Sequence, residues 1–138
     1  GIVVRSGSRV GYVSGTTGFA SCKDRTQAMI TQDQAEKAVD WLRENARSMA
    51  QARAERLYLE QWIKTVKATV QLESNAPSIA ATETVALASA RYLAALQAYK
   101  EAVSADEYNR FMVTAAEAKI EAWRSQESTR RAEGRATS

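Results

Sequence analysis

The side chains that could do chemistry in this chain are carboxylates, lysines and arginines, because its 138 residues include no histidine. This excludes Ser-His-Asp and Cys-His arrangements, histidine general bases and every metal site built with an imidazole. The single cysteine, Cys22, has no second cysteine for an internal disulfide or a multi-cysteine zinc site, so we expect a reducing compartment. We predict that the protein is not an enzyme and that it holds no cofactor and no metal.

An acidic series at helical spacing is the nearest approach to a metal site: Asp33, Glu36, Asp40 and Glu44. A carboxylate face of the di-iron type would also need Glu-x-x-His, which this chain lacks. Basic residues lie among these acids, three or four positions away from them. We therefore interpret the series as a solvated, salt-bridged helix face.

Two neighbourhoods combine aromatic and basic side chains, as sites for single-stranded nucleic acid do. The candidate nucleic-acid-binding residues are Lys64, Lys67, Arg124, Arg130 and Arg131. The two lysines lie near Trp62, and the three arginines follow Trp123. The alternative, which we favour, is that the aromatic rings fill a thin hydrophobic seam and the basic side chains solvate it. The last two arginines are the better candidates, because a frayed basic tail can reach phosphates.

The formal net charge of +3 favours a nucleic-acid surface when the chain is taken as a whole, but the distribution of the charge along the chain does not. Residues 1–28 carry +3, residues 29–124 carry −1 and residues 125–138 carry +1. The basic excess lies at the ends and not on the long central part. The charge of the whole chain therefore overstates the case for nucleic acid.

One long helix over residues 31–73 must position the acidic series and the two candidate lysines. The stretch has no glycine or proline, and Thr31 with Gln34 matches a capping box. At 1.5 Å per residue it is a rod of about 60 Å. Residues 50–56 offer only alanine and polar or charged side chains, which indicates either a zone of close approach or a weak waist. The apolar positions recur at steps of three and four: Ala35, Val39, Leu42, Ala46, Met49, Leu59, Ile63, Val66 and Val70.

Residues 74–78 contain the clearest helix breaker, Pro77, so we expect a turn there and a second long helix that starts near this proline. Folding back at this turn gives a long antiparallel α-hairpin in which the numbers of paired residues add up to about 153. The expected pairs are Trp62 with Arg91 and Tyr92, Leu42 with Phe111, Ile30 with Trp123, and Arg47 with Asp106.

Two alternatives stay open at residues 104–107, which match a capping box that starts at Ser104. Either a third helix starts there, or one helix continues with a change of register. We favour continuity, because no glycine or proline interrupts the segment. Gly134 has the position of a stop signal, so we expect the helix to fray between residues 127 and 133.

The predicted fold class is therefore all-α, a coiled-coil-like hairpin of two long helices. A two-helix rod has little interior and exposes a second apolar stripe, so we expect a homo-oligomer, as in a four-helix assembly. No apolar run reaches 18 residues, so no membrane span is expected, and no small-molecule substrate is evident.

Residues 1–28 differ in kind from the helical hairpin domain over residues 29–138, which ends in a basic tail. The first segment is rich in glycine and serine, and we expect a flexible extension. Met29 lies just before the helix start, so the reading frame can also begin there, with the first 28 residues as an upstream, non-native extension.

The chain resembles a group of small helical proteins encoded by tailed bacteriophages and prophages. The likeness is carried by AQARAERLYLEQWIKTVKA (residues 50–68) and AAEAKIEAWRSQESTRRAEGR (residues 115–135), and it extends over residues 29–135. It implies a location in the cytoplasm of a bacterial host cell and brings no catalytic residues.

Two functional hypotheses are compatible with these features. The first is a non-enzymatic phage or prophage accessory in DNA metabolism, in replication or recombination, which contacts DNA or a DNA-bound protein through the five basic residues named above. The alternative is a phage assembly or scaffolding protein that binds only other proteins through its helical faces. The near-neutral central part suits the alternative equally well.

Overall fold

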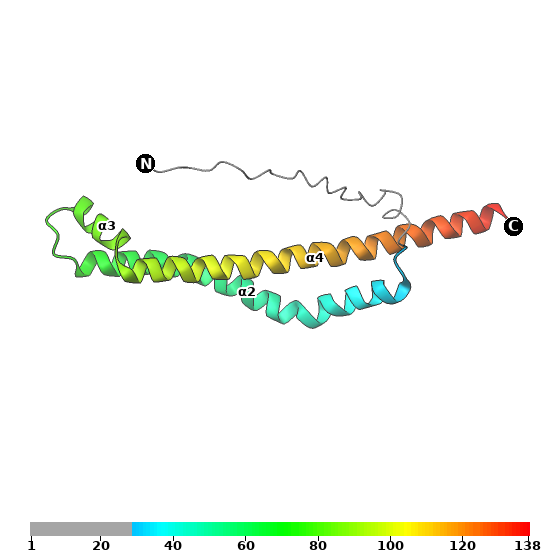
Figure 1. Cartoon of the computed structure of the whole chain (residues 1–138), viewed down its shortest axis with the longest axis horizontal. Coiled ribbons are helices and arrows are strands. Elements are labelled where there is room, and N and C mark those ends of the chain that lie inside the picture. Colours follow the sequence, from blue (N-terminus) through cyan, green and yellow to red (C-terminus); the bar gives the residue numbers. More distant parts are fainter. Residues whose placement is uncertain (1–28) are drawn as a thin grey trace, which may run out of the picture.

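The computed structural model describes residues 29–138, and its regular elements in this range are three helices (Figure 1). They are α2 (Gln32–Glu73), α3 (Ile79–Leu87) and α4 (Ala90–Ala136). The two long helices have 42 and 47 residues, so each is a rod of roughly 60 to 70 Å. The all-α prediction is confirmed for this part of the chain, whereas the expectations for residues 1–28 lie outside the described residues.

The predicted start and end of the first long helix are confirmed. The Thr31 hydroxyl accepts a hydrogen bond from the Gln34 amide at 3.2 Å, and the Gln34 side chain accepts one from the Thr31 amide at 3.0 Å. This capping box satisfies two backbone groups that the first helical turn would otherwise leave without partners. At the other end, Ser74 has an extended backbone and terminates α2 at Glu73.

Helices α2 and α4 pack together and run in opposite directions. Three contacts show this, since the residue number of the partner on α4 falls as the residue number along α2 rises. Ile30 contacts Gln126, Arg56 contacts Asp106, and Glu73 contacts Arg91. The predicted register is wrong in the middle of the molecule and toward α3, where Asp106 meets Arg56 and not Arg47, nine residues earlier. At the other end it differs by three residues, because Ile30 meets Gln126 and not Trp123. The cause is α3, which belongs to the connection and moves the point at which the chain folds back.

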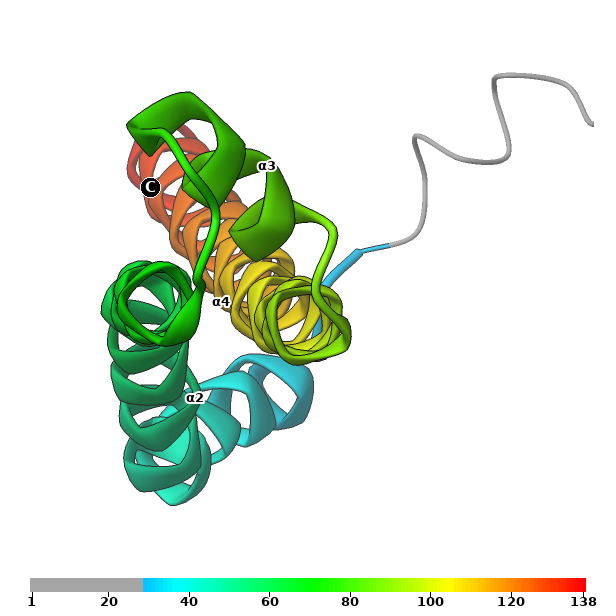
Figure 2. The same ribbon diagram turned by 90° about the vertical axis from the view of Figure 1, so that its left-hand side faces the viewer.

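The break between α3 and α4 was not predicted, since we expected one helix from Pro77 onward. Ser89 makes this break: its hydroxyl donates to the carbonyl of Ala86 at 2.7 Å and accepts from the amide of Tyr92 at 3.2 Å. It therefore ends one helix and caps the next. In Figure 2, α3 lies at the end of the molecule where α2 and α4 meet, and Ala86 is fully buried there against Val66, Val70 and Ala95.

The continuity of the helix through residues 104–107 is confirmed, because α4 is uninterrupted from Ala90 to Ala136. The capping motif that begins at Ser104 does not start a new helix, because Asp106 faces α2 and forms an ion pair with it. The expected end of the helix between residues 127 and 133 is wrong, because α4 continues to Ala136. A single glycine costs a helix only about 1 kcal/mol relative to alanine, and Arg135 in the last turn interacts favourably with the helix dipole.

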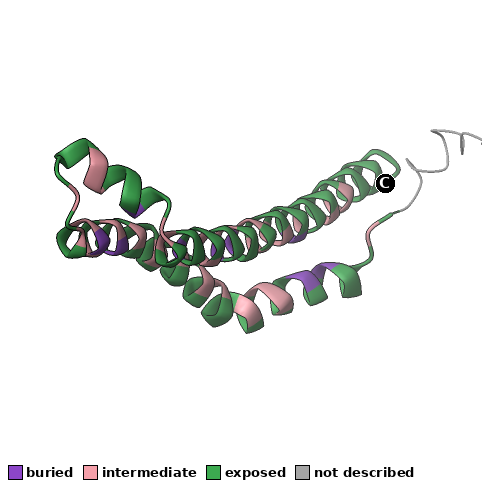
Figure 3. Cartoon of the chain, turned by 60° about the vertical axis from the view of Figure 1, so that its left-hand side comes forward, coloured by how far each residue is buried: buried purple, intermediate pink, exposed green. Residues whose placement is uncertain are grey.

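All of the buried residues and most of the half-buried residues of the two long helices lie on one seam along each helix, at alternating steps of three and four (Figure 3). On α2 they are Ala35, Ala38, Leu42, Asn45, Met49, Ala52, Arg56, Leu59, Ile63, Val66 and Val70. On α4 they are Tyr92, Ala95, Tyr99, Ala102, Asp106, Asn109, Val113, Ala116, Ile120, Trp123 and Glu127. The seam is thus thinner than predicted, with alanine and polar groups in many layers.

Several predicted seam positions point outward instead. Val39 and Trp62 are exposed, and Phe111 is 72% exposed, so the expected pairing of Leu42 with Phe111 is wrong. Tyr92 packs on the cluster that contains Val66, whereas Trp62 does not belong to it. The aromatic rings therefore fill the seam only in part.

The weak waist is the alternative that the structure supports for residues 50–56. Figure 1 shows α2 bending away from α4 in its middle and returning toward its N-terminal end. An open groove of about 460 Å³ lies in this region, between Met49 and Arg53 on α2 and Asn109 and Val113 on α4. Alanine side chains are too short to close the seam here.

Candidate functional site

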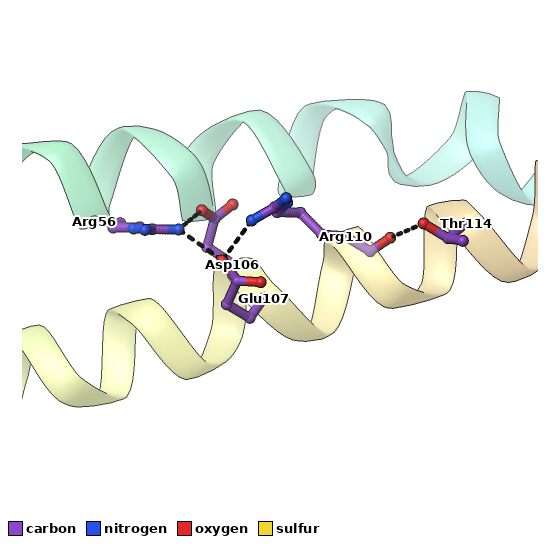
Figure 4. A network of polar contacts seen from close by, with 5 residues as sticks. All are labelled: Arg56, Asp106, Glu107, Arg110 and Thr114. Carbon is purple, nitrogen blue, oxygen red and sulfur yellow. Dashed lines mark hydrogen bonds and ion pairs between the residues drawn. The ribbon is translucent and has the colours of Figure 1, made fainter.

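The most buried polar group of the described residues is Asp106, which is 6% exposed and lies in the middle of the seam. Its carboxylate accepts a hydrogen bond from the Arg56 guanidinium at 2.9 Å, and Glu107 accepts from the same nitrogen at 3.0 Å (Figure 4). Arg110, one turn further along α4, donates to Glu107 at 2.7 Å. Two cations and two anions therefore balance each other within this network.

The electrostatics of the network indicate a structural role, which is to hold α2 and α4 in one register. The pKa of Arg56 is raised above its ordinary value, chiefly by the hydrogen bond to Asp106 and next by the one to Glu107. The guanidinium thus stays charged at every physiological pH. A buried charge that loses its partner is costly, so the pair favours the one register in which Arg56 lies opposite Asp106.

Lys64 and Lys67, predicted to contact nucleic acid, lie near the α3 end of α2. Lys67 is half-buried and forms an ion pair with Glu83 of α3 at 2.6 Å. This contact raises the pKa of Lys67 and lowers the pKa of Glu83. Lys67 therefore serves to dock α3, while Lys64 is exposed and lies 3.5 Å from the side-chain oxygen of Gln61.

The three predicted arginines lie on α4, at the opposite end of the molecule. Arg124 pairs with Glu121 at 3.6 Å and Arg130 with Glu127 at 3.1 Å, and both arginines are exposed. Arg131 donates to the Glu127 carbonyl at 3.3 Å. The structure does not bring these residues together with the lysines, because Lys67 lies near Tyr92 and Arg124 follows roughly 45 Å further along α4.

The acidic series on α2 is solvent-exposed in the structure. Asp33 pairs with Lys37 at 2.8 Å, one helical turn away, and this contact raises the pKa of Lys37. Among residues 29–138, no three acidic or cysteine side chains cluster in a way that could hold a metal ion. Within the same range, no helix combines the length and the apolar character needed to cross a membrane.

An exposed second apolar stripe was expected from the sequence, but which large apolar side chains point outward was not predicted. Tyr58 and Trp62 stack on each other with ring centroids 6.4 Å apart, although both are exposed. On α4, Tyr108 is 63% exposed and lies one turn before the exposed Phe111. None of the large side chains of the described residues is fully buried. The signal was present in the sequence, because Tyr108 and Phe111 do not fall on the 3-4 repeat of the seam.

No protein-family model matches the chain, and no curated protein or solved structure matches it either. The geometry of the described residues is therefore the basis for a functional conclusion.

Proposed function

We propose that this chain is a non-enzymatic helical protein that works by binding other proteins, first of all copies of itself, through the outward faces of α2 and α4. The observation that carries the proposal is the set of exposed large apolar side chains on these helices, among them Tyr58, Trp62, Tyr108 and Phe111. Exposed apolar side chains that lie together, as the stacked Tyr58 and Trp62 do, are typical of protein interaction sites, and tyrosine, tryptophan and phenylalanine are the residues enriched there.

The thin seam supports the same proposal. Alanines and a salt bridge fill many of its layers, so a single copy buries little apolar surface for two rods of this length. The 3-4 spacing of the seam favours coiled-coil packing, and a second pair of helices would supply the apolar cover that is lacking. The resemblance to small phage and prophage proteins suggests phage assembly in a bacterial host cell as the setting.

The test is the mass of the full chain in solution, measured by light scattering over a range of concentrations. We expect a defined oligomer that dissociates on dilution. A monomer at every concentration, with the helical circular dichroism spectrum of a folded chain, would overturn self-association.

A second candidate function, an accessory in DNA metabolism, is favoured by the exposed basic end of α4. Arg124, Arg130 and Arg131 are exposed near the end of this helix, where a phosphate backbone can reach them. Fluorescence anisotropy with labelled single- and double-stranded DNA tests this function. Binding that weakens with added salt and is lost when Arg130 and Arg131 are both changed to alanine supports it, and no binding at low salt removes it.

A further inference from the structure

Helix α4 carries a second uncharged line of residues in addition to its seam, and all of its members are exposed. They recur at alternating steps of three and four from residue 104 to residue 136, so they lie on one face of the helix. We call this line the outer stripe; it consists of Ser104, Tyr108, Phe111, Ala115, Ala118, Ala122, Ser125, Thr129, Ala132 and Ala136. Its neighbouring exposed lines on α4 carry charged residues such as Arg110, Glu117 and Lys119.

The side chains of the outer stripe change in size along the helix. Tyr108 and Phe111 lie in its first third, and only small side chains follow. If a second stripe packs antiparallel, Tyr108 lies opposite Ala132 of the second copy and Phe111 lies opposite Thr129. Each large ring then meets a small residue, as a packed interface requires. A parallel pair would place Tyr108 on Tyr108 and leave the alanine layers unfilled.

The length of the outer stripe gives the area of such a contact. The outer stripe extends over 33 residues of α4, from 104 to 136, and thus over about 50 Å. Two helices in contact share a strip about 10 Å wide. Each copy would therefore cover roughly 500 Å², or roughly 1,000 Å² in total, which reaches the lower limit of specific protein interfaces. The last turns of α4 would gain the most, because residues 128–136 are all exposed in one copy.

The charges that flank the outer stripe suit the antiparallel pair at both ends. Glu107 of one copy, which also accepts from Arg56 and Arg110 of its own chain, lies beside Arg135 of the other copy, and the symmetry repeats this contact. Like charges meet only at the centre, where Lys119 and Glu121 each face their own counterpart. Arg124 lies 3.6 Å from Glu121 and offsets part of that repulsion.

We propose that the outer stripe of α4 is the contact face for a second copy of this chain, which packs its own outer stripe against it in the antiparallel direction. The inference rests on the proposed function, because it names the partner and the face of that self-association. It makes the unit of assembly a four-helix arrangement with the two α4 helices at its centre.

The first test compares the association of the full chain with that of two variants by sedimentation equilibrium. Phe111→Lys places a charge in the outer stripe, and we expect it to raise the dissociation constant about tenfold or more. Leu72→Lys is the matched control, since Leu72 is also highly exposed but lies on α2. Association that is weakened by Leu72→Lys and unchanged by Phe111→Lys would overturn the inference and leave the proposed function standing, whereas a monomeric parent chain would overturn both.

The second test fixes the direction of packing with cysteines, in a background in which Cys22 is changed to serine. Ala115→Cys and Ser125→Cys variants are mixed and oxidised, and we expect disulfides between unlike chains. Like chains should not be joined, because their cysteines lie roughly 15 Å apart along the helix, beyond disulfide reach. Disulfides between like chains, or none at all, would overturn the antiparallel stripe contact.

Discussion

Asp106 and Arg56 show what one residue contributes to a rod with so thin an interior. The carboxylate is buried in the seam and is held by the guanidinium at 2.9 Å. In a long helical seam of repeated alanines, many registers offer similar packing, and a buried polar pair can select one of them. The pairing of these two residues was not predictable from the sequence pattern, because it depends on α3, which lengthens the connection between the long helices.

We expect Asp106→Ala to lower the melting temperature by several degrees, since it leaves Arg56 facing the seam without its main partner. Asp33→Ala is the control, because it breaks a solvent-exposed pair with Lys37, and such pairs contribute little to stability. Thermal unfolding followed by circular dichroism measures both. Equal effects of the two changes would show that the central pair does not stabilise the fold.

The contact between Lys67 and Glu83 should give a small pH dependence at each end of the scale. The folded pKa of Glu83 is depressed, so its contribution is present above its ordinary value of 4.5 and is lost as pH falls through the folded pKa. The folded pKa of Lys67 is raised, so its contribution is present below 10.5 and is lost as pH rises through the folded pKa. Urea unfolding of the parent chain and of Glu83→Gln should differ near neutral pH and converge in acid, once the pH is below the folded pKa of Glu83. Because both groups are partly exposed, added salt should shrink the difference. A difference that persists in acid would assign the effect to packing instead.

At the scale of the elements, two serines with similar neighbours behave differently. Ser104 begins a motif that fits the capping box, yet it lies inside α4. Ser89 lacks a glutamate or glutamine three residues later, yet it caps α4 through the Tyr92 amide. Tertiary contacts decide between them, because Asp106 is used in the seam and Ala86 is fully buried by the docking of α3.

We expect Ser89→Ala to destabilise the chain by about 1 kcal/mol, the usual cost of a lost helix cap. Ser104→Ala is the matched control and should be neutral or slightly stabilising, since alanine is the better residue in a helix interior. Urea unfolding of both variants checks the difference. A larger effect at Ser104 would place the helix boundary where the sequence motif has it.

Gly134 offers a separate test of the end of α4. A Cβ atom added there would meet nothing within 4 Å, so no contact opposes a side chain. We expect Gly134→Ala to stabilise the last turns by about 0.5 to 1 kcal/mol. Slower amide hydrogen exchange at residues 128–136 measures this gain, and unchanged exchange would indicate that these turns are not helical in solution.

At the scale of the whole molecule, the sequence predicted what depends on local patterns. The capping box at Thr31, the long helix without breakers and the 3-4 repeat led to the all-α class and to the bounds of α2. The register, α3 and the outward position of Trp62 depend on contacts between distant residues, which a single sequence does not specify. The five basic candidate residues lie at two ends of the molecule and form no common surface, because the long helices separate them.

The most direct measurement is amide hydrogen exchange of the full chain at several protein concentrations, read out by mass spectrometry. The end of α4 has no cover within one copy, and an isolated helix end is only marginally stable. We therefore expect the protection of residues 128–136 to rise with concentration, while that of the cluster around Val66 and Ala86 stays constant. Exchange at the end of α4 that is the same at every concentration would contradict an assembly through this helix.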